Sequence, residues 1–268
     1  MPAIPTQGTA LALSGDGLAA VCSQLGVHAP EVWTVLAVET SGCGYISDRR
    51  PTILYERHYF SRLTKGRFDD GDISDPKAGG YGPTGSHQYD RLSKAAALDA
   101  NAALRSASWG LGQVMGANFA IAGFPDVQGM VAAMYDSEDL QLAAMAGFLT
   151  SIKLNRALQV HDWPSFARGY NGENFAINHY DSRLNGEFQK FSSGVLPDLN
   201  VRAAQLYLTY LGFHPGPVDG VQGSLTFSAL AQYQSQKGLP ARAVIDGDTV
   251  AQLVSSLPAI SARAGLGK

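Results

Sequence analysis

The sequence predicts a mainly helical α+β protein with two domains, the second a compact unit of three helices. Apolar residues recur at helical spacing through most of residues 1–192. A Ser-Ser-Gly break at 192–194 then separates two apolar patterns. The segment 197–258 has three helical patterns of its own, joined by turns that contain Asp-Gly. We therefore expect each of the two segments to fold around its own core.

The first clear helix is expected at Pro30–Glu39, because its apolar residues share one face and glycines follow it at 42 and 44. Residues 52–60 (TILYERHYF) fit a strand or a helix equally well. Residues 66–91 are rich in Gly, Asp and Pro and predict an irregular excursion or a small hairpin. The remaining helices of this part are expected at 91–105, 126–134, 137–158, after the capping residue Asp162, and at about 177–191.

In the second segment, helices are expected near 201–211, 225–236 and 249–257. Gly212 and Gly238 follow the first two patterns at the positions that helix ends favour.

Composition excludes several classes of function. The net charge is -3 and the pI is about 6.0, so the basic surface of a nucleic-acid binder is not expected. No apolar window is long enough to cross a bilayer, and the N-terminus carries no Lys or Arg before its apolar patch, which argues against a secretory signal. The six histidines lack metal-ligand spacing, so we expect no metal, no other cofactor and no zinc amidase or peptidase activity. Cys22 and Cys43 are expected as reduced thiols, with a single bridge left open.

Glu39 is the strongest candidate for a chemical role. It shares the apolar face of its predicted helix and lies at the C-terminal end, where the helix dipole disfavours negative charge. Desolvation and the dipole both raise a carboxyl pKa, and a carboxyl protonated near neutral pH can protonate a leaving glycosidic oxygen. The alternative is a solvated helix-end carboxylate paired with Arg49 or Arg50.

Three motifs carry a family resemblance. VLAVETSGCGY around Glu39, ASWGLGQVM at 107–115 and GYNG at 169–172 occur in the order found in goose-type lysozymes and lytic transglycosylases of the lysozyme-like superfamily. Together with TILYERHYF they most resemble the phage N-acetylmuramidase family of endolysins, over about residues 15–191. Two positions depart from the transglycosylase pattern, which has Ser directly after the Glu, here Thr40, and GLMQ where this chain has GLGQ.

The resemblance implies a lysozyme-like catalytic domain at 1–192 in which Glu39 is the general acid. Gln113 would line the cleft and Tyr170 would lie near Glu39; alternatively, Gln113 only bonds backbone and Tyr170 is an ordinary half-buried ring. The residues expected to contact substrate are Gln113, Tyr170, Asn171, Glu56 and Ser41.

A second carboxylate is the open question, since glycosidases commonly use two. The candidates are Asp48, the acidic run 69–75 and Glu56, which lies in an apolar stretch and is expected to be partly buried. A buried ion pair with an arginine is the favoured interpretation of Glu56, and a solvated loop that of the acidic run. Because the related enzymes work with one Glu, we expect a single essential acid.

Residues 201–253 resemble the peptidoglycan-binding domain 1 family, with a plain helical accessory domain as the alternative. The matching residues are Ala204-Gln205-Leu206, Leu211-Gly212-Phe213, Asp219-Gly220, Gly223, Thr226, Tyr233-Gln234, Gly238-Leu239 and Asp246-Gly247.

The two resemblances together imply an endolysin that cleaves the β-1,4 bond between N-acetylmuramic acid and N-acetylglucosamine. Its partner would be bacterial peptidoglycan, and a holin would release the enzyme, as a monomer, from the host cytoplasm to the cell wall. The alternatives are a lytic transglycosylase that leaves 1,6-anhydro ends and a wall-binding protein without catalytic activity.

Overall fold

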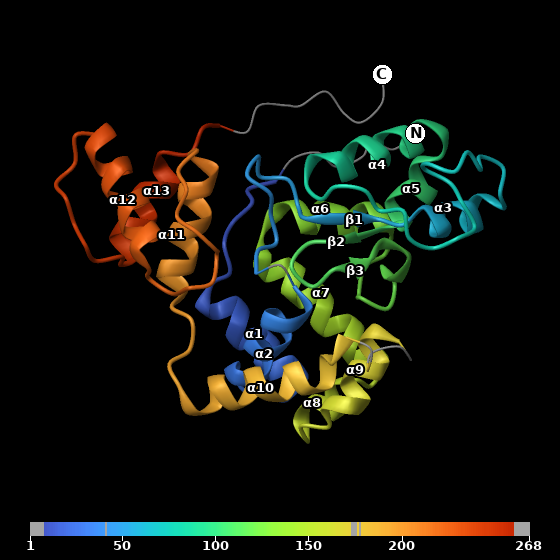
Figure 1. The fold of residues 1–268 in the computed structure, drawn as a ribbon, viewed down its shortest axis with the longest axis horizontal. Helices are drawn as coiled ribbons and strands as arrows, with labels where there is room; N and C mark the ends of the chain where they lie inside the picture. The colour runs from blue at the N-terminus through green and yellow to red at the C-terminus, as the bar shows by residue number, and fades with distance from the viewer. Residues whose placement is uncertain (1–7, 41, 173–175, 177, 260–268) are drawn as a thin grey trace.

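A computed structural model describes residues 8–40, 42–172, 176 and 178–259 and confirms a mainly helical protein with a small sheet (Figure 1). Helix α10 runs below α1 and α2, and α11–α13 form a group of their own at the left of the view (Figure 1). The helices before this group are α1 (Gly15–Leu25), α2 (Ala29–Glu39), α3 (Arg57–Thr64), α4 (Ser86–Leu98), α5 (Ala100–Arg105), α6 (Val127–Asp136), α7 (Glu138–Ser151), α8 (Asn155–Gln159), α9 (Trp163–Asn171) and α10 (Tyr180–Ser193).

The sheet is antiparallel, with strand order β1-β2-β3. Its strands are β1 (Ile53–Tyr55), β2 (Ala107–Trp109) and β3 (Val114–Met115), followed by a short 3₁₀ helix at Gly116–Asn118. Strand β1 pairs with β2 through Ile53 opposite Trp109, so the TILYERHYF segment lies beside the WGLGQ turn. The sheet thus brings two of the sequence motifs together.

Capping residues explain where the continuous helical patterns divide. Asp99 accepts a hydrogen bond from the Ala102 N–H and begins α5, so the pattern at 91–105 forms two helices. The TILYERHYF segment is a strand and then a helix, because Glu56 lies between them as the extended N-cap residue of α3. The excursion is irregular to Gly85 and forms no strand, and α4 begins earlier than expected, at Ser86.

The second part contains three helices, as predicted: α11 (Leu199–Tyr210), α12 (Ser224–Gln236) and α13 (Gly247–Ser255). Asp198 and Asp246 cap α11 and α13 by accepting backbone N–H groups of the first turn. Leu206, Leu230 and Leu253 are buried between the three helices.

The core of this second part also includes residues from the N-terminal part of the chain. Ala10, Ala12 and Tyr45 pack in the same cluster as α11–α13. The Ala12 N–H donates to Tyr207 Oη (3.0 Å), and Tyr210 Oη donates to the Ala10 carbonyl (3.2 Å). The two parts therefore share a packed interface, and independent folding of 1–192 and 197–258 stays a prediction.

Both cysteines are free thiols. The Cys43 Sγ donates to the Tyr45 carbonyl (3.2 Å), and burial, followed by the nearby Glu138 charge, raises the pKa of Cys43 to about 12. This thiol is therefore protonated at neutral pH.

Candidate active site

Helix α2 ends where the sequence predicted, at Glu39. The Thr40 hydroxyl closes the helix by donating to the Leu36 carbonyl (2.5 Å) and accepting from the Gly42 N–H (3.1 Å). Arg183 of α10 donates to the Val38 carbonyl (3.4 Å), so the last turn of α2 is also held from below. The side chain of Glu39 and all of Ser41 lie outside the described residues, so their roles stay predictions.

The two arginines considered as partners for a helix-end carboxylate are engaged elsewhere. Arg49 donates to the Thr9 and Pro258 carbonyls at 2.8 and 2.9 Å. Arg50 forms an ion pair with Asp48 at 2.8 Å. Because the Glu39 side chain lies outside the described residues, both interpretations of Glu39 stay predictions.

A cavity of about 670 Å³ lies between the loop that follows α2 and the small sheet. Two of the residues expected to contact substrate, Gln113 and Glu56, line it. The other lining residues are Cys43, Tyr45, Ile46, Thr52, Ile53, Leu54, Thr84, Gly85, Ser108 and Met115. The chain that leaves the Glu39 end of α2 and the sheet thus both contribute residues to this cavity.

Gln113 has a left-handed backbone conformation (φ 47°) in the turn between β2 and β3. Its Oε1 accepts from the Ser108 hydroxyl (2.8 Å), and its Nε2 donates to the Gly110 carbonyl (2.8 Å) and the Thr52 carbonyl (3.3 Å). Gln113 therefore lines the cavity, as the resemblance implied, and also bonds backbone, as the alternative held. These bonds fix the orientation of the amide.

Glu56 is mostly buried, with 14% of its side chain exposed, but its partner is not the expected arginine. Glu56 Oε2 lies 3.1 Å from His58 Nδ1. The neighbouring Arg57 forms its ion pair with Asp75 instead, at 3.2 Å. Burial raises the pKa of Glu56, although His58 and a hydrogen bond with Tyr81 oppose the shift. The cavity wall therefore holds a carboxyl that is easier to protonate than an exposed one.

The acidic run is an ordered loop. Asp70 Oδ1 accepts the N–H groups of Ile73 (2.9 Å) and Ser74 (3.2 Å), and Asp72 pairs with the exposed Lys94 at 3.2 Å. Within the described residues, no group of three or more His, Cys, Asp or Glu could hold a metal ion.

Tyr170 lies at the end of α9 and reaches the same turn as Gln113. Its hydroxyl donates to the Gly112 carbonyl (2.7 Å), and its ring stacks on Phe166 with centroids 5.6 Å apart. Asn171, half-buried, is the last residue of α9. The second and third motifs are therefore in direct contact.

Sequence reasoning missed Gln141, which joins the loop after Glu39 to the turn before Gln113. It is fully buried on α7; its Oε1 accepts the Leu111 N–H (2.6 Å) and its Nε2 donates to the Gly44 carbonyl (3.3 Å). A Cβ at Gly44 would lie 1.9 Å from Gln141 Oε1, so any larger residue there would displace the Gln141 amide.

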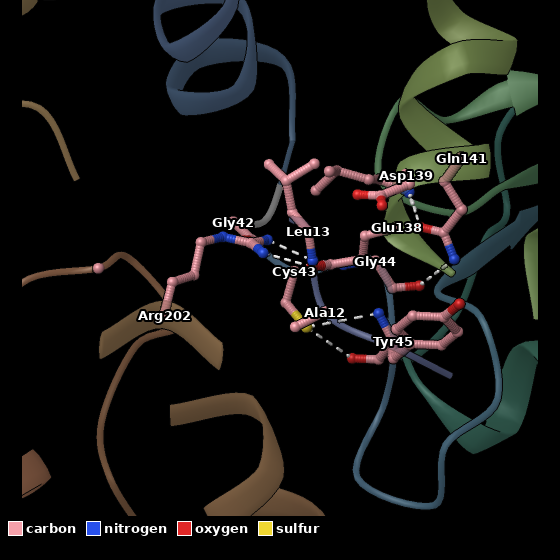
Figure 2. Close-up of polar contacts among 12 residues, drawn as sticks. Ala12, Leu13, Gly42, Cys43, Gly44, Tyr45, Glu138, Asp139, Gln141 and Arg202 are labelled. Carbon is pink, nitrogen blue, oxygen red and sulfur yellow. Dashed lines mark hydrogen bonds and ion pairs between the residues drawn. The ribbon is translucent and has the colours of Figure 1, made fainter. Parts of the chain in front are cut away.

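Glu138, one turn before Gln141 on α7, was missed as well (Figure 2). Its buried carboxylate accepts the N–H groups of Leu13 (2.9 Å) and Gly44 (2.8 Å) and pairs with both Nη atoms of Arg202 from α11. Burial alone would raise the pKa of Glu138, but the Arg202 charge and these hydrogen bonds bring the pKa below its usual value.

The sequence did contain a signal for this pair. Glu138 and Gln141 fall on the same buried helix stripe as Leu142, Met145 and Leu149, where an apolar residue is the norm. A polar side chain on such a stripe requires a buried partner.

The loop that follows α2 and the small antiparallel sheet line one cavity, and two of the three motifs are in contact beside it. A family model described as N-acetylmuramidase matches residues 28–192, and a peptidoglycan binding domain model matches residues 197–253. The chain therefore belongs to the N-acetylmuramidase family and carries a C-terminal peptidoglycan-binding domain.

Among solved structures, the crystal structure of Burkholderia AP3 phage endolysin is similar to this chain, with 35% sequence identity and a TM-score of 0.62. The match covers 67% of this chain and 70% of that one. A search of curated proteins gave no match. No helix within the described ranges is long and apolar enough to cross a membrane. Together, the family matches and the similar structure support a peptidoglycan-degrading enzyme of the endolysin type.

Proposed function

We propose that this protein hydrolyses the β-1,4 bond between N-acetylmuramic acid and N-acetylglucosamine, with Glu39 as the general acid. One observation carries the proposal: the loop leaving the Glu39 end of α2, the small sheet and Gln113 in its β2–β3 turn line one cavity. Membership of the N-acetylmuramidase family supports the substrate.

In this mechanism, Glu39 protonates the glycosidic oxygen as the bond to the leaving sugar breaks. Its position at the C-terminal end of α2 favours the protonated form of the carboxyl, because the helix dipole opposes the charged form. A water molecule then attacks the sugar carbon, directly or after assistance by the substrate's own N-acetyl group. Glu39 is the single essential acid, and no metal or other cofactor takes part.

The fixed polar groups of the cavity would bind the sugars. Gln113 and Ser108 are bonded to each other there and present their remaining hydrogen-bonding capacity to a ligand. We assign Gln113, Tyr170, Asn171, Glu56 and Ser41 to substrate contacts.

We expect Glu39→Gln to abolish glycan cleavage while the fold and wall binding survive. The amide keeps the size of the side chain but cannot deliver a proton, so the rate should fall by about 10²- to 10⁴-fold. The measurement is clearing of purified sacculi, with circular dichroism to verify folding. A folded variant that keeps more than about a tenth of the wild-type rate would overturn the assignment of the acid.

Mass spectrometry of the released muropeptides tests the reaction itself. Hydrolysis adds one water to each cut end, whereas a lytic transglycosylase leaves a 1,6-anhydro end. Anhydro products would show that the enzyme is a lytic transglycosylase and not a hydrolase. Purified protein that binds sacculi without cutting them would identify a wall-binding protein instead.

We further propose that residues 1–192 form the catalytic domain and 197–258 the wall-binding domain of a monomer that lyses a bacterial host. Before lysis it would remain in the host cytoplasm until a holin opens the membrane. The peptidoglycan-binding match and the similarity to a phage endolysin support this role.

A further inference from the structure

A buried ion pair next to the catalytic helix joins the two domains. Arg202 of α11 is 1% exposed and Glu138 of α7 is fully buried. Figure 2 shows the Arg202 guanidinium reaching out of the wall-binding domain to the Glu138 carboxylate.

Arg202 also contacts the loop that follows the catalytic helix. Its Nη2 donates to the Gly42 carbonyl (2.8 Å), and Glu138 accepts the Gly44 N–H (2.8 Å). The Gly42 N–H in turn donates to the Thr40 hydroxyl, which donates to the Leu36 carbonyl in the last turn of α2. An unbroken series of hydrogen bonds thus leads from the wall-binding domain to the helix end that carries Glu39.

Packing alone does not hold this loop. A second cavity, of about 900 Å³, opens between the domains, and Arg202, Thr40 and Gly42 line it. Gly42 has a left-handed conformation (φ 81°) and no side chain with which to anchor itself. The hydrogen bonds from Arg202 and Glu138 therefore restrain the loop at Gly42 and Gly44, in addition to the bond from Gln141.

An arginine suits this position for a chemical reason. Its planar guanidinium reaches both carboxylate oxygens of Glu138 and still has an N–H for the Gly42 carbonyl. A lysine would supply the charge without this fixed geometry, and an apolar residue would leave Glu138 as a buried charge with only two backbone donors.

We infer that Arg202 is a positioning residue for the cleavage reaction: it sets the loop after α2, and through it the acid Glu39, so docking of the wall-binding domain completes the active site. This inference rests on the proposed function, because it requires Glu39 to be the acid. It assigns the wall-binding domain a role in turnover besides binding the wall.

The test uses full-length variants on a soluble, uncrosslinked glycan fragment, so that wall binding does not limit the rate. We expect Arg202→Met to lower kcat on the order of 10²-fold, the effect of a small misplacement of a catalytic group, with KM nearly unchanged. Arg202→Lys should recover part of this loss, because it restores the charge. Glu138→Gln, which keeps the shape, should also lower kcat.

Tyr207→Phe is the matched control. Tyr207 accepts an interdomain hydrogen bond from the Ala12 N–H and makes none to the described residues of the loop, so its loss should leave kcat unchanged. Circular dichroism and thermal unfolding identify the temperature range in which every variant is folded. Should Arg202→Met fail to fold, Arg202→Lys and Glu138→Gln provide the same comparison.

A folded Arg202→Met or Glu138→Gln enzyme with wild-type kcat would overturn the inference, as would an equal kcat loss in Tyr207→Phe. Glu39→Gln, assayed in parallel, separates the two hypotheses. An active Glu39→Gln enzyme contradicts the proposed acid. An inactive one, alongside fully active Arg202 and Glu138 variants, contradicts only the positioning role.

Discussion

Glu138 is fully buried and Glu56 mostly buried within the region matched by the muramidase family, yet the pKa of Glu138 is lowered and that of Glu56 is raised. Burial raises the pKa of both carboxyls, so their different partners decide whether the net shift is upward or downward. Glu138 faces a permanently charged guanidinium and two backbone N–H groups. Glu56 faces one imidazole and one phenol. The partners of Glu138 keep it charged, and this charge holds the structure together. The partners of Glu56 leave it a titratable carboxyl in the cavity wall.

The largest effect should come from breaking the Glu138 pair on one side only. Arg202→Met leaves a buried charge uncompensated and should lower the free energy of unfolding by about 3–5 kcal/mol. The double variant Glu138→Leu with Arg202→Met removes both charges and should recover much of this loss, since apolar replacements of buried pairs are often neutral. Urea unfolding measures both.

Lys190→Met is the control for that experiment, because it breaks the exposed pair between Lys190 and Glu187 (3.0 Å). An exposed pair contributes little, so stability should hardly change. Equal losses in Lys190→Met and Arg202→Met would contradict the importance of burial.

The pH dependence of stability should differ in sign between the two carboxylates. The folded-state pKa of Glu138 lies below its unfolded value, so its contribution is present above the unfolded pKa and is lost as pH falls through the folded one. The contribution of Glu56 is present below the unfolded pKa and is lost as pH rises through the raised folded one.

Urea unfolding of wild type, Glu138→Gln and Glu56→Gln between about pH 3 and pH 6 covers ordinary carboxyl titration. Relative to wild type, the Glu138→Gln curve should rise less steeply with pH and the Glu56→Gln curve should fall less. Parallel curves for all three proteins would contradict the opposite shifts.

Of the two carboxylate variants assayed for activity on sacculi, Glu56→Gln should have the smaller effect. If Glu39 is the only essential acid, this variant should lose less than the roughly 10²-fold minimum of a general acid, and less than Glu39→Gln loses. Clearing of sacculi by the two variants, side by side, provides the comparison. Equal losses would indicate a second catalytic carboxylate at Glu56.

Local features of the fold could be predicted from the sequence because local residues determine them. Asp162 and Asp246 cap the helices expected after them, and α2 ends at the residue predicted from its apolar face. The TILYERHYF segment could not be resolved, because its division depends on the pairing of β1 with a strand more than fifty residues further along the chain.

The sequence predicted the three motifs of the site but not the buried contacts that join them. Gln113 and Tyr170 were expected in the site, and the Gly112 carbonyl brings Tyr170 to the turn that holds Gln113. Glu138, Gln141 and Arg202 were missed because their partners are distant: Glu138 and Arg202 are 64 positions apart, and Gln141 and Gly44 are 97. Their sequence signal is a polar residue on a buried stripe, which does not identify the partner.

The bond between Arg202 and the Gly42 carbonyl bears on the engineering of chimeric lysins. Recombining catalytic and binding modules assumes that the junction between them is inert. Here a replacement binding module would need an arginine whose guanidinium reaches Glu138. Otherwise, Glu138 in the catalytic module would have to be replaced by a neutral residue. Without such a change, a chimera joined at Ser192-Ser193-Gly194 would gain a new binding module but lose the Arg202 contacts to Gly42 and Glu138 of the catalytic module.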